Sequence, residues 1–154
     1  MNKTIIAVLL VSSLTMNVFA YDEALAATLD KSFSKVTQKN IIKSKSKINA
    51  KDLFKMISEK KQFVILDIRT KAETSILGLK TDNTLEIPLE NLFKKKNLDR
   101  LPTKEPIVLV CHSGSRTKMA VMNLKMLGFK NILVLKEGIV GIAKMGGAKN
   151  VPVK

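Results

Sequence analysis

Short apolar runs alternate with stretches of helical spacing along residues 48–145. Three runs have the continuous apolar character of strands covered on both faces, and a briefer one is stopped by a proline; they are Phe63–Leu66, Ile107–Val110, Asn131–Leu135 and Leu85–Pro88. The intervening stretches predict helices over residues 49–60, 70–78, 89–95, 113–127 and 138–145. This alternation predicts an α/β fold with a parallel sheet.

Capping residues locate two of the predicted helix ends. Asn49 can cap the first helix, with Asp52 at the third helical position near the positive end of the dipole. Gly128 stands where a glycine commonly ends a helix in the left-handed conformation. On the helix before Gly128, the apolar pattern predicts a core-facing side that carries Met119, Met122, Met126 and Leu127.

Composition limits the class of protein. The 154 residues suit one domain with a small surplus, at about 150 residues per domain. Hydrophobic residues make up 45% and charged residues 26%, which excludes a wholly disordered chain. A single cysteine excludes a disulfide scaffold. No apolar run reaches the ~18 residues of a confident membrane span, which excludes a polytopic membrane protein.

The net charge of +14 comes from 24 lysines and only three arginines, set against 13 acidic residues. Nucleic-acid sites usually combine arginines with aromatic side chains, and aromatics are only 5% of this chain, so we expect no nucleic-acid partner. A solvated lysine-rich surface is one interpretation of the charge. The other is a field that attracts small anions or an anionic membrane surface.

Residues 1–20 have the anatomy of a secretory signal peptide. Lys3 supplies a positive start, Ile5–Val11 is an unbroken apolar run, and small residues precede a cleavage point after Ala20. We therefore expect an exported, periplasmic protein. An uncleaved membrane anchor and a short N-terminal helix of the fold are the alternatives.

Residues 21–47 are predicted to form an arm or linker between the signal and the domain. Apolar residues recur there at spacings of four, four and three, which fits a helix, and a Lys/Ser-rich stretch follows at Lys43–Lys47. A flexible stalk is the alternative. The predicted domain then spans residues 48–147, and residues 148–154 form a tail.

The candidate chemistry lies where the Ile107–Val110 run meets the next helix. Cys111 follows this run directly, at the carboxyl end of a buried strand, where α/β sheets bind ligands. The amides of His112–Arg116 can turn inward as an anion nest, and the helix N-terminus adds partial positive charge. Arg116 adds a permanent cation, and Gly114 permits a positive φ. These features favour a thiolate, the nucleophilic form of cysteine.

The other loop residues have smaller expected roles. Ser113 and Ser115 are too small to fill the cradle, and Thr117 can form a local hydrogen bond. His112 is the only histidine; it could be a catalytic base, but its amide and a position at the pocket mouth are the favoured interpretation. A buried structural cysteine is the alternative for Cys111. No cluster of histidines and cysteines indicates a metal site.

Cys111–Thr117 (Cys-His-Ser-Gly-Ser-Arg-Thr) resembles the active-site loop of the rhodanese family, Cys-x-x-Gly-x-Arg-Ser/Thr. Further segments resemble the family's motifs in the family's order: Val64–Arg69 its strand ending in Asp-x-Arg, Leu85–Pro88 its Asn-Ile-Pro, and Gly128–Ile139 its closing Gly-Phe…Leu-x-Gly-Gly. The resemblance covers roughly Ile48–Met145. With its signal peptide, the chain looks like the exported single-domain rhodaneses of the phage-shock type.

This resemblance implies a five-stranded parallel sheet flanked by helices and a sulfurtransferase that works through a Cys111 persulfide. The sulfur donor would be thiosulfate or another small anionic sulfane donor, and the acceptor a thiol or cyanide. Arg116 would bind the donor's oxygens or brace the loop, and Asp67 and Arg69 match positions that support the site. No metal or organic cofactor is implied.

The chain departs from the family pattern at several positions. The usual Glu-x-x-x-Gly-His-Ile stretch is replaced by Glu73–Lys80, which has no histidine, and Glu137 replaces the first closing glycine.

Two other functions stay open. A non-catalytic sulfur carrier or binding module would use the same fold. A cysteine-loop phosphatase or arsenate reductase is less favoured, because that group has five residues between Cys and Arg, and here there are four.

Overall fold

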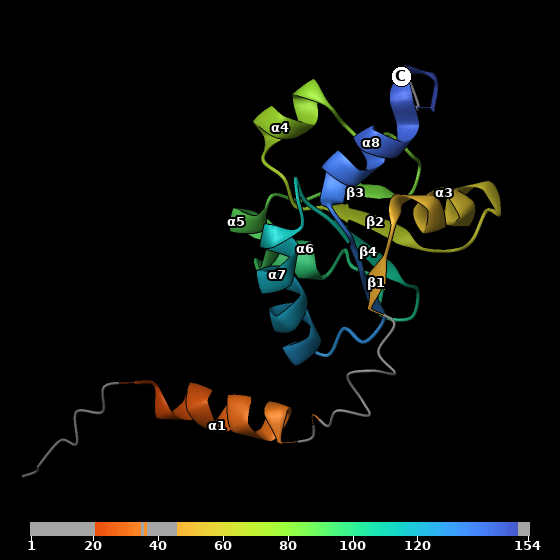
Figure 1. The fold of residues 1–154 in the computed structure, drawn as a ribbon. Helices are drawn as coiled ribbons and strands as arrows, with labels where there is room; N and C mark the ends of the chain where they lie inside the picture. Colours follow the sequence, from red (N-terminus) through yellow and green to blue (C-terminus); the bar gives the residue numbers. More distant parts are fainter. Residues whose placement is uncertain (1–20, 35, 37–45, 151–154) are drawn as a thin grey trace, which may run out of the picture. The chain divides into compact units, whose positions relative to one another are not determined.

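The computed structural model describes residues 21–34, 36 and 46–150, with side chains described as far as Met145. Five strands form one all-parallel sheet (Figure 1): β1 (Lys47–Ile48), β2 (Val64–Asp67), β3 (Thr84–Glu86), β4 (Ile107–Val110) and β5 (Ile132–Leu135). The helices, labelled as in Figure 1, are α1 (Glu23–Phe33), α3 (Ala50–Ser58), α4 (Lys71–Ile76), α5 (Leu89–Leu92), α6 (Lys95–Leu98), α7 (Ser115–Met126) and α8 (Gly138–Asn150). The expected α/β fold, with a five-stranded parallel sheet flanked by helices, is confirmed.

The sheet order is β1-β5-β4-β2-β3, so β4 lies at the centre. From β2 the chain crosses outward to β3, whereas from β4 it crosses to β5 on the other side. The carboxyl ends of β2 and β4 therefore flank the point where the connections change direction, which is where open α/β sheets bind ligands. The residues that follow β2 and β4 are Ile68–Thr70 and Cys111–Gly114.

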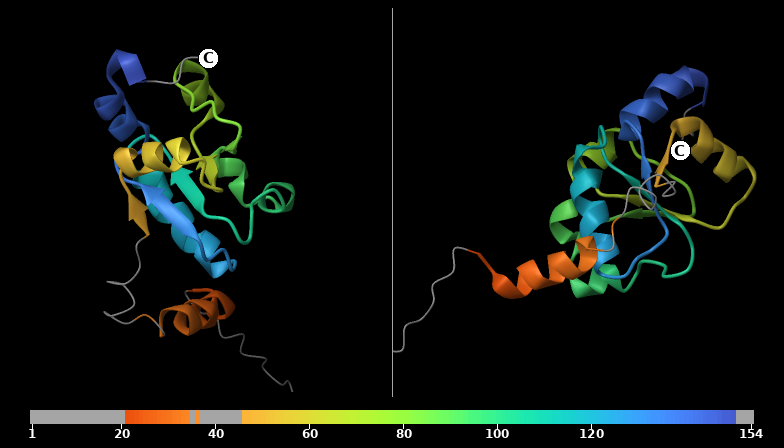
Figure 2. Two further views of the ribbon diagram at one scale, coloured as in Figure 1. Left: turned by 90° about the vertical axis from the view of Figure 1, so that its right-hand side faces the viewer. Right: turned by 60° about the horizontal axis from the view of Figure 1, so that its bottom comes forward.

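Two hydrophobic clusters cover the two faces of the sheet. One packs β-strand side chains against α5, α6 and α7 and includes Leu66, Leu109 and Leu124. The other packs Ile65 and Val108 against α3 and α8. Figure 2 shows α3 and α8 lying together in both views. All four residues of β4 are buried, as its continuous apolar run predicts.

Both capping predictions are confirmed. Asn49 and Asp52 form a reciprocal capping box at the start of α3, with the Asp52 amide donating to Asn49 Oδ1 at 2.8 Å. Gly128 has φ +99° just after α7. Its amide donates to the Lys125 carbonyl, and the next amide donates to the Leu124 carbonyl, which is the Schellman pattern.

The structure differs from the sequence pattern in three places. Residues 47–48 form strand β1, which the pattern did not indicate and which assigns Lys47 to the sheet rather than to the arm. The helix expected over 89–95 is two short helices, α5 and α6. The predicted core-facing side of α7 is wrong, because Met119 and Met122 are exposed. The buried residues of α7 are Thr117, Ala120 and Leu124.

The N-terminal part of the described chain is a separate unit. Helix α1 is capped by Asp22, whose side chain accepts the Leu25 amide at 2.9 Å, and it buries none of its residues. A helix in this part of the arm agrees with the spacing of its apolar residues. The expected signal peptide lies outside the described residues. Among those that are described, no helix is long and apolar enough to cross a membrane.

Candidate active site

Cys111 follows the central strand, and its side chain is only 1% exposed. On one side it belongs to the hydrophobic cluster that contains Ile68 and Ala120. On the other side its Sγ accepts a hydrogen bond from the Gly114 amide at 3.1 Å. The sulfur therefore lies in a shielded position with a polar donor directed at it.

The N-terminus of α7 has no side-chain cap. Its N-cap residue is Gly114, with φ +100°, a left-handed conformation in which glycine carries no steric penalty. Thr117 Oγ1 donates to the Gly114 carbonyl at 2.8 Å and thereby holds the turn from inside the helix. The positive end of this 12-residue helix is thus directed at the sulfur rather than at a capping carboxylate or hydroxyl.

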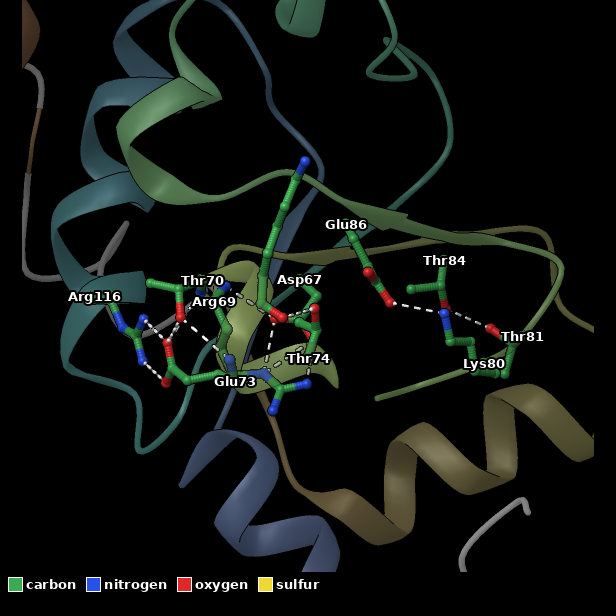
Figure 3. Close-up of polar contacts among 11 residues, drawn as sticks. Asp67, Arg69, Thr70, Glu73, Thr74, Lys80, Thr81, Thr84, Glu86 and Arg116 are labelled. Carbon is green, nitrogen blue, oxygen red and sulfur yellow. Dashed lines mark hydrogen bonds and ion pairs between the residues drawn. The ribbon is translucent and has the colours of Figure 1, made fainter. Parts of the chain in front are cut away.

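Arg116 forms a two-pronged ion pair with Glu73 of α4 (Figure 3). Nη1 donates to Oε2 at 2.7 Å, and Nη2 donates to Oε1 at 2.5 Å. Glu73 also accepts hydrogen bonds from the amide and hydroxyl of Thr70, so one carboxylate ties the start of α4 to the start of α7. Glu73 belongs to a segment that departs from the family pattern, and the sequence indicates no role for it because its partner Arg116 lies 43 residues away.

The charges of this pair stabilise each other. The hydrogen bonds from Arg116, followed by those from Thr70, hold the pKa of Glu73 well below its usual value of 4.5. Hydrogen bonds from Arg116 to Glu73 in turn raise the pKa of Arg116, and electrostatic interactions with the Cys111 and Asp67 side chains act in the same direction. The resemblance implies that Arg116 binds the donor's oxygens or braces the loop. Its guanidinium is engaged by Glu73, and both roles remain predictions.

Asp67 and Arg69 form a buried ion pair beside the loop. Their side chains are 0% and 2% exposed. Arg69 Nη2 donates to Asp67 Oδ2 at 2.6 Å, and the Arg69 amide donates to Asp67 Oδ1 at 3.0 Å. Asp67 is in register with Val110, the residue before Cys111. The pair therefore closes the turn after β2 at the position adjacent to the cysteine, and its role in supporting the site remains a prediction.

The remaining predicted loop residues differ in their exposure to solvent. His112, Ser113 and Ser115 are exposed, whereas Gly114 and Thr117 are buried. The exposed three can meet a substrate from solvent. Their roles in binding remain predictions.

The first turn of α8 is joined to the loop by its backbone. The amides of Ile139 and Val140 donate to the carbonyls of Cys111 and His112 at 2.9 and 3.2 Å. Gly138 has φ +54°, and a Cβ there would lie 2.1 Å from the Cys111 carbonyl oxygen. Only glycine fits this approach. The closing motif of the sequence contained Gly138, but its contact with the loop needed the fold.

Glu137 also has a positive φ, +58°, where the family pattern has glycine. Its exposed carboxylate accepts a hydrogen bond from Lys144 at 2.8 Å. Within the described part of the chain, no group of three or more His, Cys, Asp or Glu side chains converges on a point that could hold a metal ion. The chemistry available at this site is that of one thiol, backbone amides and paired charges.

A profile of the rhodanese-like domain family matches residues 49–145. The chain belongs to the rhodanese-like domain family. A sulfurtransferase of Allochromatium vinosum is 27% identical to it over 101 residues, which are 66% of this chain and 91% of that protein. The crystal structure of a rhodanese-related protein from Thermoplasma volcanium superposes with a TM-score of 0.55 at 29% identity and covers 65% of this chain and 92% of that one.

Some relatives are much longer than this rhodanese-like chain. An adenylyltransferase and sulfurtransferase of Ogataea parapolymorpha is 27% identical over 100 residues, which are only 24% of its length. The shared part is therefore the rhodanese-like domain. The family match and the relatives named as sulfurtransferases support a role in sulfur transfer.

Proposed function

We propose that this rhodanese-like protein transfers sulfane sulfur from a small anionic donor, such as thiosulfate, to a thiol or cyanide through a persulfide on Cys111. One observation carries the proposal: Cys111 Sγ accepts the Gly114 amide in front of a helix N-terminus that no side chain caps. Such a cradle suits an anionic sulfur and also the additional sulfur of a persulfide.

In the first half-reaction, the Cys111 thiolate attacks the outer sulfur of thiosulfate. An S–S bond forms to Cys111, the S–S bond of thiosulfate breaks, and sulfite leaves with the electron pair. In the second, a thiolate or cyanide attacks the outer sulfur of the persulfide, and Cys111 leaves as the thiolate. Atoms and electrons balance across both steps without an external oxidant.

The other residues have positioning roles in this proposal. Arg116 holds the loop against α4 through Glu73, and its charge favours the anionic forms of sulfur. Asp67 and Arg69 fix the neighbouring turn. His112, Ser113 and Ser115 lie at the solvent side, where the donor's oxygens would be held. Because Cys111 is almost fully buried, the donor must displace part of this exposed rim to reach the sulfur.

Steady-state transfer from thiosulfate to cyanide, measured as thiocyanate, tests the proposal. We expect turnover by the wild-type protein. Absence of thiocyanate formation with thiosulfate, together with absence of transfer to a small thiol, would contradict it. A loaded protein that releases its sulfur only slowly would instead favour the sulfur carrier.

The cellular location is a separate proposal. The charged start, apolar run and small residues before Ala20 support export to the periplasm, with cleavage after Ala20. N-terminal sequencing of the protein recovered from fractionated cells tests this. A mature chain that begins at Tyr21 in the periplasmic fraction is expected, and an intact Met1 in the cytosolic fraction would overturn it.

A further inference from the structure

The outward side of α7 carries three methionines that the fold does not bury. Met119 is 59% exposed and Met122 45% exposed, and Met126 is half-buried. Their spacing of three and four residues places them on one stripe of the helix, which we name the methionine face. It lies opposite the side that packs on the sheet. Contiguous exposed apolar surface that is rimmed by polar residues marks interaction sites, so the methionine face is a candidate interaction surface.

Charge indicates which partner would fit the methionine face. Helix α7 has no acidic residue, and Lys118 and Lys125 run along one border of the stripe. Within the described residues, neither lysine forms an ion pair. A second copy of this chain would bring the same cations together, which is unfavourable. A polypeptide with apolar and acidic side chains would satisfy both features.

The position of the methionine face connects it with the cysteine. Helix α7 starts at the loop that follows Cys111 and runs away from it (Figure 1), so a polypeptide on this face has one end next to the loop. Flexible methionine side chains also adapt to partners of different shape. We propose that the methionine face docks an acidic polypeptide whose cysteine accepts sulfur from Cys111. This inference rests on the proposed function and specifies its acceptor.

The transfer step needs no further reactant. The partner's cysteine thiolate attacks the outer sulfur of the Cys111 persulfide. A new S–S bond forms on the partner, the bond between Cys111 and the outer sulfur breaks, and Cys111 leaves as the thiolate. The partner then carries the persulfide.

Competition between matched acceptors tests the proposal in the full chain. The probes are a synthetic peptide with a cysteine flanked by leucines and glutamates, the same peptide with lysines in place of glutamates, and dithiothreitol. We expect a lower KM for the acidic peptide than for the basic one. In the double variant Lys118→Glu/Lys125→Glu the KM for the acidic peptide should rise about tenfold, while turnover with dithiothreitol stays unchanged. Lys104→Glu, an exposed lysine elsewhere, is the control.

A binding measurement separates failure of docking from failure of sulfur transfer. The acidic peptide with serine in place of its cysteine is added to protein carrying ¹³C-labelled methionine methyl groups. We expect the peptide to change the methyl chemical shifts of Met119 and Met122 and to leave that of Met145 unchanged. The Met122→Ser variant should bind the peptide more weakly. Equal binding of the two peptides, or shifts that avoid α7, would overturn the docking surface. Absence of transfer to dithiothreitol would overturn the proposed function and the sulfur-accepting role of the partner, but not the docking surface.

Discussion

The turn between β2 and α4 and the turn between β4 and α7 lie at the same edge of the sheet. They differ in how their polar groups are paired. After β2, Asp67 and Arg69 neutralise each other, and Thr70 and Glu73 cap α4 reciprocally. After β4, no side chain caps α7, and the nearest acceptor for a loop amide is the sulfur of Cys111. The first turn satisfies its own polar groups and serves as a support. In the second, the Gly114 amide is directed at the sulfur of Cys111 instead.

The Arg116–Glu73 pair joins these two turns. It extends from the capped helix to the uncapped one, so the closed turn holds the open turn in place. A glycine N-cap such as Gly114 makes a helix start less stable than a side-chain cap by only about a few tenths of a kcal/mol. In our proposal, the β4–α7 turn gives up this small amount of stability and gains an anion site.

Replacing Cys111 with serine removes the reactive group of the open turn and should have the largest effect. We expect transfer from thiosulfate to cyanide to fall by at least ~10³-fold, since Cys111 is the only cysteine in the sequence. The free energy of unfolding should change little, because serine is nearly isosteric. Thiocyanate formation and denaturant unfolding are the two measurements. Retained turnover in this variant would show that the two turns do not differ as described.

Gly138→Ala tests the backbone approach that supports the open turn. Its Cβ would lie 2.1 Å from the Cys111 carbonyl oxygen and take a positive φ, so we expect a loss of about 2–4 kcal/mol in stability together with impaired transfer. Gly128→Ala is the matched control, with φ +99° and no atom within 4 Å. It should lose about 1–2 kcal/mol and keep its activity. Equal effects of the two variants on transfer would contradict the role of Gly138.

Glu73→Gln removes the ion pair between the two turns and leaves Cys111 and the other loop residues in place. The variant keeps a side chain that can still accept from Thr70, but it loses the charge that engages Arg116. Because the pair is about one-third exposed, we expect a stability loss of about 0.5–1 kcal/mol and a roughly tenfold lower kcat. Glu137→Gln, which interrupts the exposed pair with Lys144, is the control. If both variants keep full kcat, the Arg116–Glu73 ion pair has no part in catalysis.

Acid should weaken the Arg116–Glu73 ion pair, and this is the smallest of the four predicted effects. The pKa of Glu73 in the folded protein is below its ordinary 4.5, so its contribution to stability is complete above pH 4.5. That contribution decreases as the pH falls below 4.5 toward the lowered pKa, since protonation then competes with Arg116. The stability difference between wild type and Glu73→Gln should therefore shrink in acid, as measured by urea unfolding. A difference that grows in acid would reverse the assignment.

Local signals were sufficient for much of the fold. The capping residues Asn49 and Asp52, and the terminating Gly128, lie in hydrogen-bonded turns that span only three to five residues, and all are confirmed. Strand β4 is recognisable because four consecutive apolar residues are buried on both faces. The position of Cys111 at the end of β4 follows directly. The identity of the loop was thus available from the sequence.

Long-range contacts were not available from the sequence. Strand β1 has two residues and exists because it pairs with Val134 and Leu135. The partner of Arg116 lies on another helix, and Gly138 meets the loop only after β5 has joined the sheet. The error on α7 has a physical cause: its start packs closely, so Thr117 and small Ala120 are buried and the larger methionines are displaced outward.

Intact-mass analysis after mixing with thiosulfate is the decisive measurement for a persulfide on Cys111. We expect one sulfur atom to be added to the wild-type protein and to be lost on treatment with cyanide or a reducing thiol. The Cys111→Ser variant should gain nothing. An unchanged mass of the wild-type protein, or the same gain in the variant, would contradict a persulfide on Cys111.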